Sequence, residues 1–274
     1  MYNGRKIILN SYDRVDLTKS ANDAEYYLDW QTALEEGTYL VSYSICKQIN
    51  MTPTTFQQLL SLSPPWARYD TSSLNATTQI LSDLTPNGRN AVCTGVVVTV
   101  QPAIANGSGS ILSGLTGSVT GTIQFPTGSV PANHTICFIT RYRTALANRK
   151  RILVAGASDF FGHNTPTLRG VVNYGGVARA NSVVSEPAIN YLNMCVSSGI
   201  PAPNNILVNG VPNGITGLTP AVPFTGTLAI NIGTVEVSGF ELNQLIIWDK
   251  ALSSSELILV SNALANYLAT GIMA

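Results

Sequence analysis

Short apolar runs of strand length fill most of the chain beyond Pro64, separated by clusters of glycine, proline, asparagine and serine. In one run Leu228, Ile230 and Ile232 alternate with small or polar residues, as in a strand with one buried face. Many short strands with turn residues between them indicate a β-sandwich or barrel. The runs expected to form strands are Val92–Val100, Gly121–Phe125, Thr135–Tyr142, Arg151–Ala155, Gly170–Tyr174, Tyr191–Val196, Ile206–Val208, Gly226–Ile232 and Phe240–Trp248.

Two other segments depart from this strand pattern. The stretch Ala105–Thr122 is rich in glycine, serine and threonine and is expected to form a long loop or hairpin. Near the end, Ser253 and Glu256 have the spacing of a capping box, and Gly271 can end the following helix. The apolar residues that should face the sandwich, or alternatively a partner, are Leu257, Val260, Leu264, Tyr267 and Leu268.

The first part of the chain has too few strands to build a core of its own. Ile7–Ser11 is expected to form a short strand, and in Tyr39–Ile45 the side chains alternate with a period of two. Two or three strands do not bury a core alone. We therefore expect residues 1–51 to form a β-arm that pairs with the main domain or with another chain.

A short segment, residues 52–65, separates this arm from the strand-rich region. Thr54 can cap a short helix that carries Phe56 and Leu59, and a proline pair then stops it. The segment is expected to be a linker, followed by one domain over residues 66–274.

The composition indicates a protein that buries much of its surface. Apolar residues make up 45% of the chain and charged residues 11%, against about a quarter charged in ordinary soluble domains. Lys plus Arg and Asp plus Glu each number 15, so the formal net charge is zero. A neutral protein is poorly steered toward nucleic acid and lacks the charge that keeps a monomer soluble. Both features favour a protein that functions as part of a larger assembly. No nucleic-acid partner is expected.

Neither a membrane span nor a secretory signal is expected. No apolar run approaches the roughly 18 residues that a span requires. The apolar stretch within Met1–Asn10 is too short for a signal peptide, so a reducing compartment is expected. Without a C-x-x-C pair, the cysteines are expected to be buried free thiols rather than zinc ligands, although a disulfide stays open. They are Cys46, Cys93, Cys137 and Cys195.

Three segments resemble the motifs of concanavalin A-like, laminin-G-like jelly rolls. Trp66–Asp70 followed by Asp83–Ala91 resembles the opening strand and D-L-S-G-N-G-x-x-A turn, with Thr-Pro in place of Ser-Gly. Leu207–Val211 resembles the L-Y-V-N-G hairpin, and Gly239–Ser253 resembles the closing strand before a helix. The resemblance implies an all-β fold, a concanavalin A-like jelly-roll β-sandwich, here with an N-terminal β-arm and one C-terminal helix.

The start of the chain has a different resemblance. Ile8–Arg14, followed after a polar stretch by Tyr39–Ile45, is similar to the opening of minor capsid or penton-type proteins of large double-stranded DNA viruses. This resemblance implies a structural virion protein, assembled in the host cytoplasm, whose partners are other capsid proteins or copies of itself. The residues assigned to arm docking are Asn10, Ser11, Asp13 and Arg14.

No arrangement of residues typical of catalysis stands out. Glycosidases of the resembled fold use two carboxylates on one strand, whereas the odd offset of Glu236 and Glu241 would put them on opposite faces. The two histidines, His134 and His163, accompany no serine or cysteine in an elbow motif, so structural roles are expected for them. We therefore expect no enzymatic activity, no catalytic residue and no cofactor.

The resemblance also implies calcium binding, at the rim formed by the loops, as a function to consider. Asp159, Asn164 and Asp249 are oxygen donors that could gather there, but no D-x-D-x-D-G loop is present, so no metal site is predicted. Basic residues cluster in Arg141–Arg143 and Arg149–Arg151. These two clusters are expected to form one hairpin tip that lies in solvent or against an acidic neighbour.

Glycan binding is the main functional alternative. A sugar site needs an aromatic platform, although aromatic rings in strands more often fill a core. The candidate rings are Phe160, Phe161, Tyr174 and Trp248. The preferred hypothesis is a non-enzymatic virion protein whose arm docks on capsid chains and whose jelly roll cements or decorates the shell. The alternative is a lectin-like module for host or extracellular glycans.

Overall fold

A computed structural model describes residues 53–101, 105–143, 148–156, 158–174, 177–182, 189–217 and 225–273, together with two short strands nearer the N-terminus. The chain divides into two compact units between Thr52 and Pro53. In the first unit, β1 (Ile8–Leu9) pairs antiparallel with β2 (Tyr39–Leu40). The four predicted docking residues, Asn10, Ser11, Asp13 and Arg14, lie outside the described residues.

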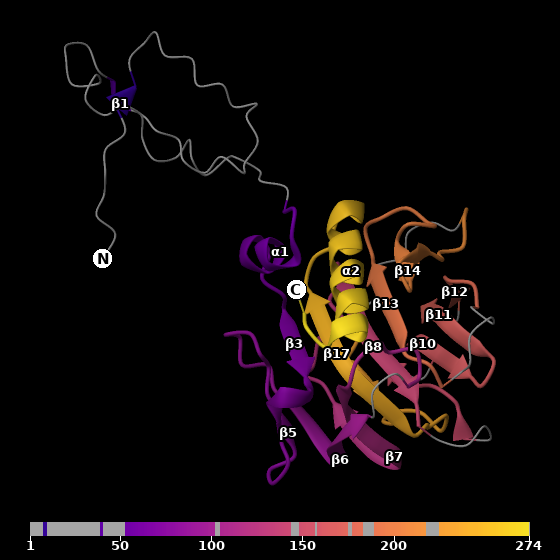
Figure 1. Ribbon diagram of the computed structural model, residues 1–274. Helices are drawn as coiled ribbons and strands as arrows, with labels where there is room; N and C mark the ends of the chain where they lie inside the picture. The colour runs from indigo at the N-terminus through magenta and orange to yellow at the C-terminus, as the bar shows by residue number, and fades with distance from the viewer. Residues whose placement is uncertain are drawn as a thin grey trace. The chain divides into compact units, whose positions relative to one another are not determined.

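The second unit is built almost entirely of antiparallel strands (Figure 1). Its helical segments are α1 (Phe56–Leu62), the 3₁₀ turn η2 (Thr71–Ser73) and α2 (Ser254–Thr270). Its strands are β3 (Ala67–Asp70), β4 (Leu74–Asn75), β5 (Ile80–Leu81), β6 (Ala91–Gln101), β7 (Leu112–Gln124), β8 (Thr135–Tyr142), β9 (Leu153–Val154), β10 (Phe160–Thr165), β11 (Leu168–Tyr174), β12 (Val177–Ala178), β13 (Leu192–Ser197), β14 (Ile206–Val208), β15 (Val211–Pro212), β16 (Ala229–Ile230) and β17 (Phe240–Trp248).

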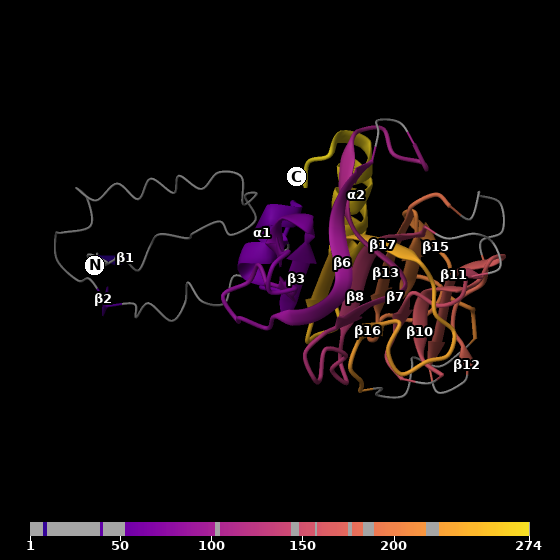
Figure 2. The ribbon, with the colours of Figure 1, turned by 90° about the horizontal axis from the view of Figure 1, so that it is seen from below.

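The strands form two layers that share one long hairpin. Their order along the main path is β12-β11-β10-β9-β16-β7-β17-β8-β13-β14-β15, and β6 runs beside β7 (Figure 2). One end of β7 pairs with β17 and the other end with β16, so this strand passes from one layer to the other. Side chains from both layers, such as Phe138 and Phe161, meet in one buried cluster. This all-β, jelly-roll sandwich confirms the fold class that the sequence predicts.

Strand β17 lies in the middle of one layer and is buried on both faces. It pairs with β8 along one side, and with β7 and β3 along the other. Leu245 and Ile247 point into the sandwich core, whereas Ile246 and Trp248 belong to a second cluster on the opposite face. A strand with two covered faces can carry a continuous apolar run rather than alternation, which explains the run Leu245–Trp248 at the end of this strand.

Helix α2 covers that opposite face of the layer, where it contacts β13, β8 and β14 (Figure 1). Its capping box forms as predicted: the Ser253 hydroxyl accepts from the Glu256 amide, and the Glu256 carboxylate accepts from the Ser253 amide. Gly271 ends the helix with a φ of +79°, a left-handed conformation that glycine adopts without strain. The buried stripe includes Leu257, Val260 and Leu264, so it faces the sandwich rather than a partner.

The segment expected to be a linker belongs to the domain instead. Phe56 and Leu59 of α1 are buried in the same cluster as the stripe of α2. The cap of α1 is Thr55, whose side chain accepts from the Gln58 amide, and not the predicted Thr54. The apolar face of this helix decided its position, because an amphipathic helix beside an uncovered apolar surface gains free energy by packing on it.

Two of the longer strands were not predicted from the sequence. Leu112–Gln124, most of which was expected to lie in a long loop or hairpin, is the long strand β7, which forms a hairpin with β6. Its glycines are needed for packing: a Cβ on Gly114 would lie 2.3 Å from Cγ of Glu241, and one on Gly117 would lie 2.5 Å from Cε1 of Phe240. Strand β10 was missed because its Phe160–Thr165 sequence has no clear alternation.

Candidate functional site

The four aromatic residues predicted as a sugar platform are all buried. Phe161 and Trp248 are 0% exposed, and Phe160 and Tyr174 are 5% exposed. The indole Nε1 of Trp248 donates to the carbonyl of Ser63 at 2.9 Å, so its polar end is also satisfied inside the protein. A sugar stacks on an exposed ring face, and these rings instead fill the core clusters. The prediction that they form a platform is therefore wrong.

Both histidines are buried and bonded within the fold. Nε2 of His134 lies 2.8 Å from the Tyr174 hydroxyl, and its Nδ1 lies 2.7 Å from the carbonyl of Pro131. His163 packs edge-on against the ring of Tyr142, with 4.6 Å between the ring centroids. Burial lowers the pKa of His134 and holds the pKa of His163 well below its ordinary value of 6.5. These positions give both residues structural roles.

This burial predicts a loss of stability in mild acid. The unfolded chain protonates these histidines near pH 6.5 while the folded chain keeps them neutral, so the unfolded state gains protons as the pH falls. Below pH 6.5 the free energy of unfolding should fall by up to about 1.4 kcal/mol per pH unit for each histidine. Urea denaturation at pH 7.5, 6.5 and 5.5 measures this slope. His163→Gln should reduce it, and an unchanged slope would contradict the assignment.

A buried polar cluster surrounds Glu241, which is 0% exposed. Its Oε2 lies 2.6 Å from Nη2 of Arg141 and 3.2 Å from Nη1 of Arg143. Its Oε1 accepts from the hydroxyl of Tyr191 at 2.6 Å. Burial raises the pKa of Tyr191, so this hydroxyl stays a donor. The basic cluster at Arg141–Arg143 thus meets an acidic neighbour of its own chain, and Glu241 is already occupied by three partners.

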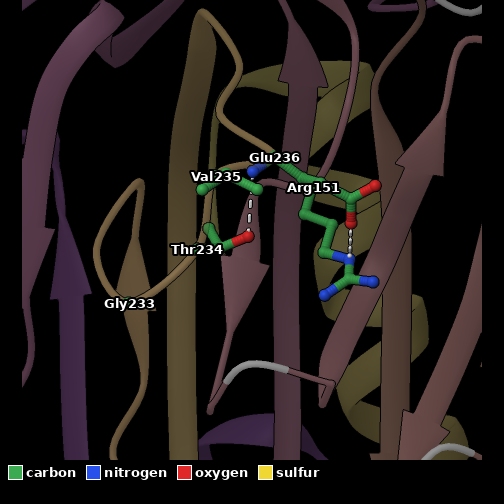
Figure 3. A pocket seen from close by; sticks show the side chains of 5 residues that line it. All are labelled: Arg151, Gly233, Thr234, Val235 and Glu236. Atoms are coloured by element: carbon green, nitrogen blue, oxygen red, sulfur yellow. Dashed lines mark hydrogen bonds and ion pairs between the residues drawn. The ribbon is translucent and has the colours of Figure 1, made fainter.

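The second carboxylate considered in the sequence, Glu236, lines an open pocket of about 640 Å³ (Figure 3). Its Oε2 forms an ion pair with Nε of Arg151 at 2.6 Å, and the side chains are 34% and 16% exposed, respectively. The remaining lining residues are Gly233, Thr234 and Val235, and Val235 is 97% exposed. The pocket therefore presents a cation, a carboxylate, a hydroxyl and an apolar side chain to solvent.

Two neighbouring side chains, Phe160 and Asn164, hold Arg151 in this pocket. Its guanidinium lies over the ring of Phe160, 4.6 Å from the centroid, as in a cation–π contact. Asn164 Oδ1 accepts from Nε of Arg151 at 3.4 Å. Phe160, one of the rings considered for a sugar platform, therefore lies buried beneath the arginine.

The loop that carries Glu236 is held in place by Asn231. Its Nδ2 donates to the carbonyls of Gly121 at 2.9 Å and Ser238 at 2.8 Å, and its Oδ1 accepts from the Ser238 amide at 2.9 Å. Asn231 has a φ of +57°, a left-handed conformation that asparagine tolerates better than most residues. These bonds pre-position the loop, so the pocket needs little ordering to accept a ligand.

Sequence reasoning missed Arg151, Thr234 and Val235 as pocket residues. Arg151 was assigned to a basic hairpin tip, and the loop after β16 carried no motif. Its one signal was the Asn231–Gly233 turn between two strands, which marks a shaped loop but not its ligand.

A second pocket, of about 310 Å³, lies between the turn before β7, the start of β13 and the last turns of α2. It carries no charged side chain among its described lining residues. Asn193, which is 1% exposed, lines it and has a side-chain oxygen without a hydrogen-bond partner. The lining residues are Gly107, Gly109, Asn190, Tyr191, Asn193, Asn209, Ala265, Leu268 and Ala269.

Within the described ranges, no three histidine, cysteine, aspartate or glutamate side chains come together as a metal ion would require. Asn164, one of the three calcium candidates, bonds to Arg151. Cys93, Cys137 and Cys195 are buried free thiols, as predicted, and Cys46 lies outside the described residues. None of the described helices is long and apolar enough to cross a membrane.

Comparison with known proteins supports the fold of this chain but does not identify a family for it. No family model and no curated protein matches the chain. Trypanosoma rangeli sialidase in complex with sialic acid is similar with a TM-score of 0.51 and 12% identity, over 74% of this chain and 33% of that chain. A mutant of the same sialidase that displays trans-sialidase activity gives 0.50 and 13%, over 72% and 32%.

The chain therefore spans about a third of the length of these sialidases. At this identity the likeness shows a shared β-sandwich fold, which agrees with the concanavalin A-like resemblance of the sequence. Neither of these neighbours is a capsid protein. Within the described residues, the fold is a β-sandwich, and the larger of the two pockets described above carries a paired arginine and glutamate.

Proposed function

We propose that the domain over residues 53–273 is a non-catalytic glycan-binding module whose sugar site is the pocket between Arg151 and Glu236. The observation that carries this proposal is the partly exposed ion pair at 2.6 Å in an open hollow of about 640 Å³. A pocket of this size accepts one or two sugar units.

The chemistry of the pocket suits sugar hydroxyls. Arginine presents several N–H donors in a planar fork, and a carboxylate presents only acceptors. Adjacent hydroxyls of a sugar ring can accept from the guanidinium and donate to the carboxylate at the same time, with charge-assisted hydrogen bonds. The exposed side chain of Val235 can contact the C–H face of the ring.

The sialidase likeness supports this proposal at the level of fold. The solved sialidase carries sialic acid, and the present chain shares a β-sandwich fold with part of that protein. The role proposed for this pocket is binding without hydrolysis. Among the described residues that line the pocket only Glu236 is a carboxylate and none is a tyrosine, whereas most glycosidases use two carboxylates and sialidases use a tyrosine nucleophile. Glu241 is buried behind two arginines and the hydroxyl of Tyr191.

The alternative of a minor capsid protein rests on residues near the N-terminus that are mostly outside the described ranges. No described contact supports docking of the arm on capsid chains, and the predicted virion localisation stays a prediction. Quantitative mass spectrometry of particles from the source, giving copies of this chain per coat subunit, tests it independently of sugar binding.

A glycan array with the full chain, followed by calorimetry on the best sugar, tests the proposed function. Glu236→Gln keeps the shape of the side chain but removes its charge, so it should weaken binding by about tenfold or more. Asn190→Ala is the matched control, because Asn190 is partly exposed and lines the other pocket. It should leave the affinity unchanged.

Two results would overturn the proposal. Loss of binding in Asn190→Ala, with Glu236→Gln unchanged, would assign the sugar to the second pocket. No binding to any glycan on the array would remove the function itself.

A further inference from the structure

We propose that two copies of this chain pair edge to edge through residues 97–101 of β6, about a twofold axis at Thr99. Strand β6 pairs with β7 along its length, but β5 covers its other side only at Ala91 and Val92. In Figure 2, β6 runs as one long curved strand.

The contacts of Gln79 show which backbone groups point away from β7. Its side-chain Oε1 accepts from the Val96 amide at 3.1 Å, and its Nε2 donates to the Val96 carbonyl at 3.0 Å. The carboxamide thus takes the place of a neighbouring strand at Val96. Since the register has no shift after Val96, strand alternation directs the amides and carbonyls of Val98 and Val100 to the same outer side.

Among the described residues, no side chain bonds to the backbone of Val98 or Val100 as Gln79 does to that of Val96. In the described part of the chain, nothing bonds to the outward amides and carbonyls of these two residues. Their side chains are 44% and 66% exposed, and Val97 beside them is 53% exposed. An unpaired strand edge with exposed apolar side chains is a template for another strand.

A second copy of the same strand fits this edge. With Thr99 on the axis, Val98 of each copy lies opposite Val100 of the other, and these pairs exchange four backbone hydrogen bonds. Thr99 faces Thr99 of the second copy, a favourable cross-strand pair. This register uses the open backbone groups and leaves Val96 with Gln79.

Charge permits the pairing as well. The strand Ala91–Gln101 contains no charged residue and no proline, the two features that usually protect an edge strand. The whole chain has a formal net charge of zero, so two copies do not repel each other strongly. An isologous contact of this kind closes as a dimer and does not propagate.

Sedimentation equilibrium of the full chain measures the dimer. Val100→Lys should raise the dissociation constant by about tenfold or more, because a lysine at the edge must be desolvated on pairing. Val211→Lys is the matched control, since Val211 on the edge strand β15 is 64% exposed, and it should leave the dimer intact. A monomeric wild-type chain at high concentration, or equal effects of both variants, would overturn the proposal.

A cysteine on the axis tests the register even if Val100→Lys folds poorly. Cα atoms of a non-hydrogen-bonded antiparallel pair lie about 4.5 Å apart, within reach of a disulfide. Under mild oxidation Thr99→Cys should therefore give a covalent dimer, beyond any formed by the wild-type cysteines, whereas Val211→Cys should not. Failure of Thr99→Cys to crosslink a chain that sediments as a dimer would show that the copies meet elsewhere.

Discussion

Replacing Glu241 with leucine should lower the free energy of unfolding by about 3–5 kcal/mol. Glu241 is fully buried, and the side chain of its partner Arg141 is 6% exposed. Without the carboxylate, the guanidinium stays in the interior with no counter-charge, and the hydroxyl of Tyr191 loses its acceptor. Because whole domains have only about 5–15 kcal/mol of stability, the variant should unfold at low urea concentration.

Urea denaturation followed by circular dichroism measures this loss. Arg143→Leu is the matched control, because its bond to the same oxygen is longer, at 3.2 Å, and its side chain is 33% exposed. It should cost less than about 1 kcal/mol. Combining Glu241→Leu with Arg141→Leu should recover stability relative to Glu241→Leu alone, since neither charge then remains buried. A Glu241→Leu protein as stable as the wild type would show that the ion pair does not hold the layer together.

Replacing Trp248 with alanine should also cost about 3–5 kcal/mol. Trp248 is 0% exposed and packs in the cluster between β17, α1 and α2. Its removal leaves a cavity where an indole was, and the carbonyl of Ser63 loses its donor. The same variant tests whether Trp248 also stacks on a sugar, as the sequence suggested. If its role is structural alone, the folded fraction of Trp248→Ala should keep its glycan affinity.

Thermal unfolding and calorimetry with the best sugar measure the two effects on the same samples. Trp248→Phe keeps most of the apolar volume and should cost less than the alanine variant. Leu62→Ala, on a side chain that is 50% exposed, is the surface control and should change stability by no more than about 0.5 kcal/mol. Loss of sugar affinity in Trp248→Ala with unchanged stability would restore the aromatic-platform hypothesis.

Elements with local signals could be predicted from the sequence. Helix α2 begins after Ser253 and ends at Gly271 because both caps are set by residues within a turn of the helix ends. The hairpin between β14 and β15 turns at Asn209 and Gly210, whose φ values are +49° and +83°, as a two-residue turn of this type requires. The predicted range Thr135–Tyr142 coincides with β8, whose centre, Ile136–Ile139, is the continuous apolar run typical of a fully buried strand.

Candidate pockets and partners depended on contacts between distant parts of the chain. The Arg141–Glu241 bond joins residues 100 positions apart, and no local pattern indicates which of several carboxylates an arginine will meet. Arg151 and Glu236 come together only because β9 and β16 are neighbours in the sheet.

The sequence by itself determined the fold class and the C-terminal helix of this protein, because periodicity, turn residues and caps act over a few positions. Tertiary structure alone decided that β7 is a strand despite its glycines, that the aromatic candidates are core, and that Val98 and Val100 lie on an uncovered edge. Whether a residue is buried or paired depends on the residue that it contacts. For most of these contacts the two residues are far apart in the chain, so a local sequence pattern does not indicate the contact.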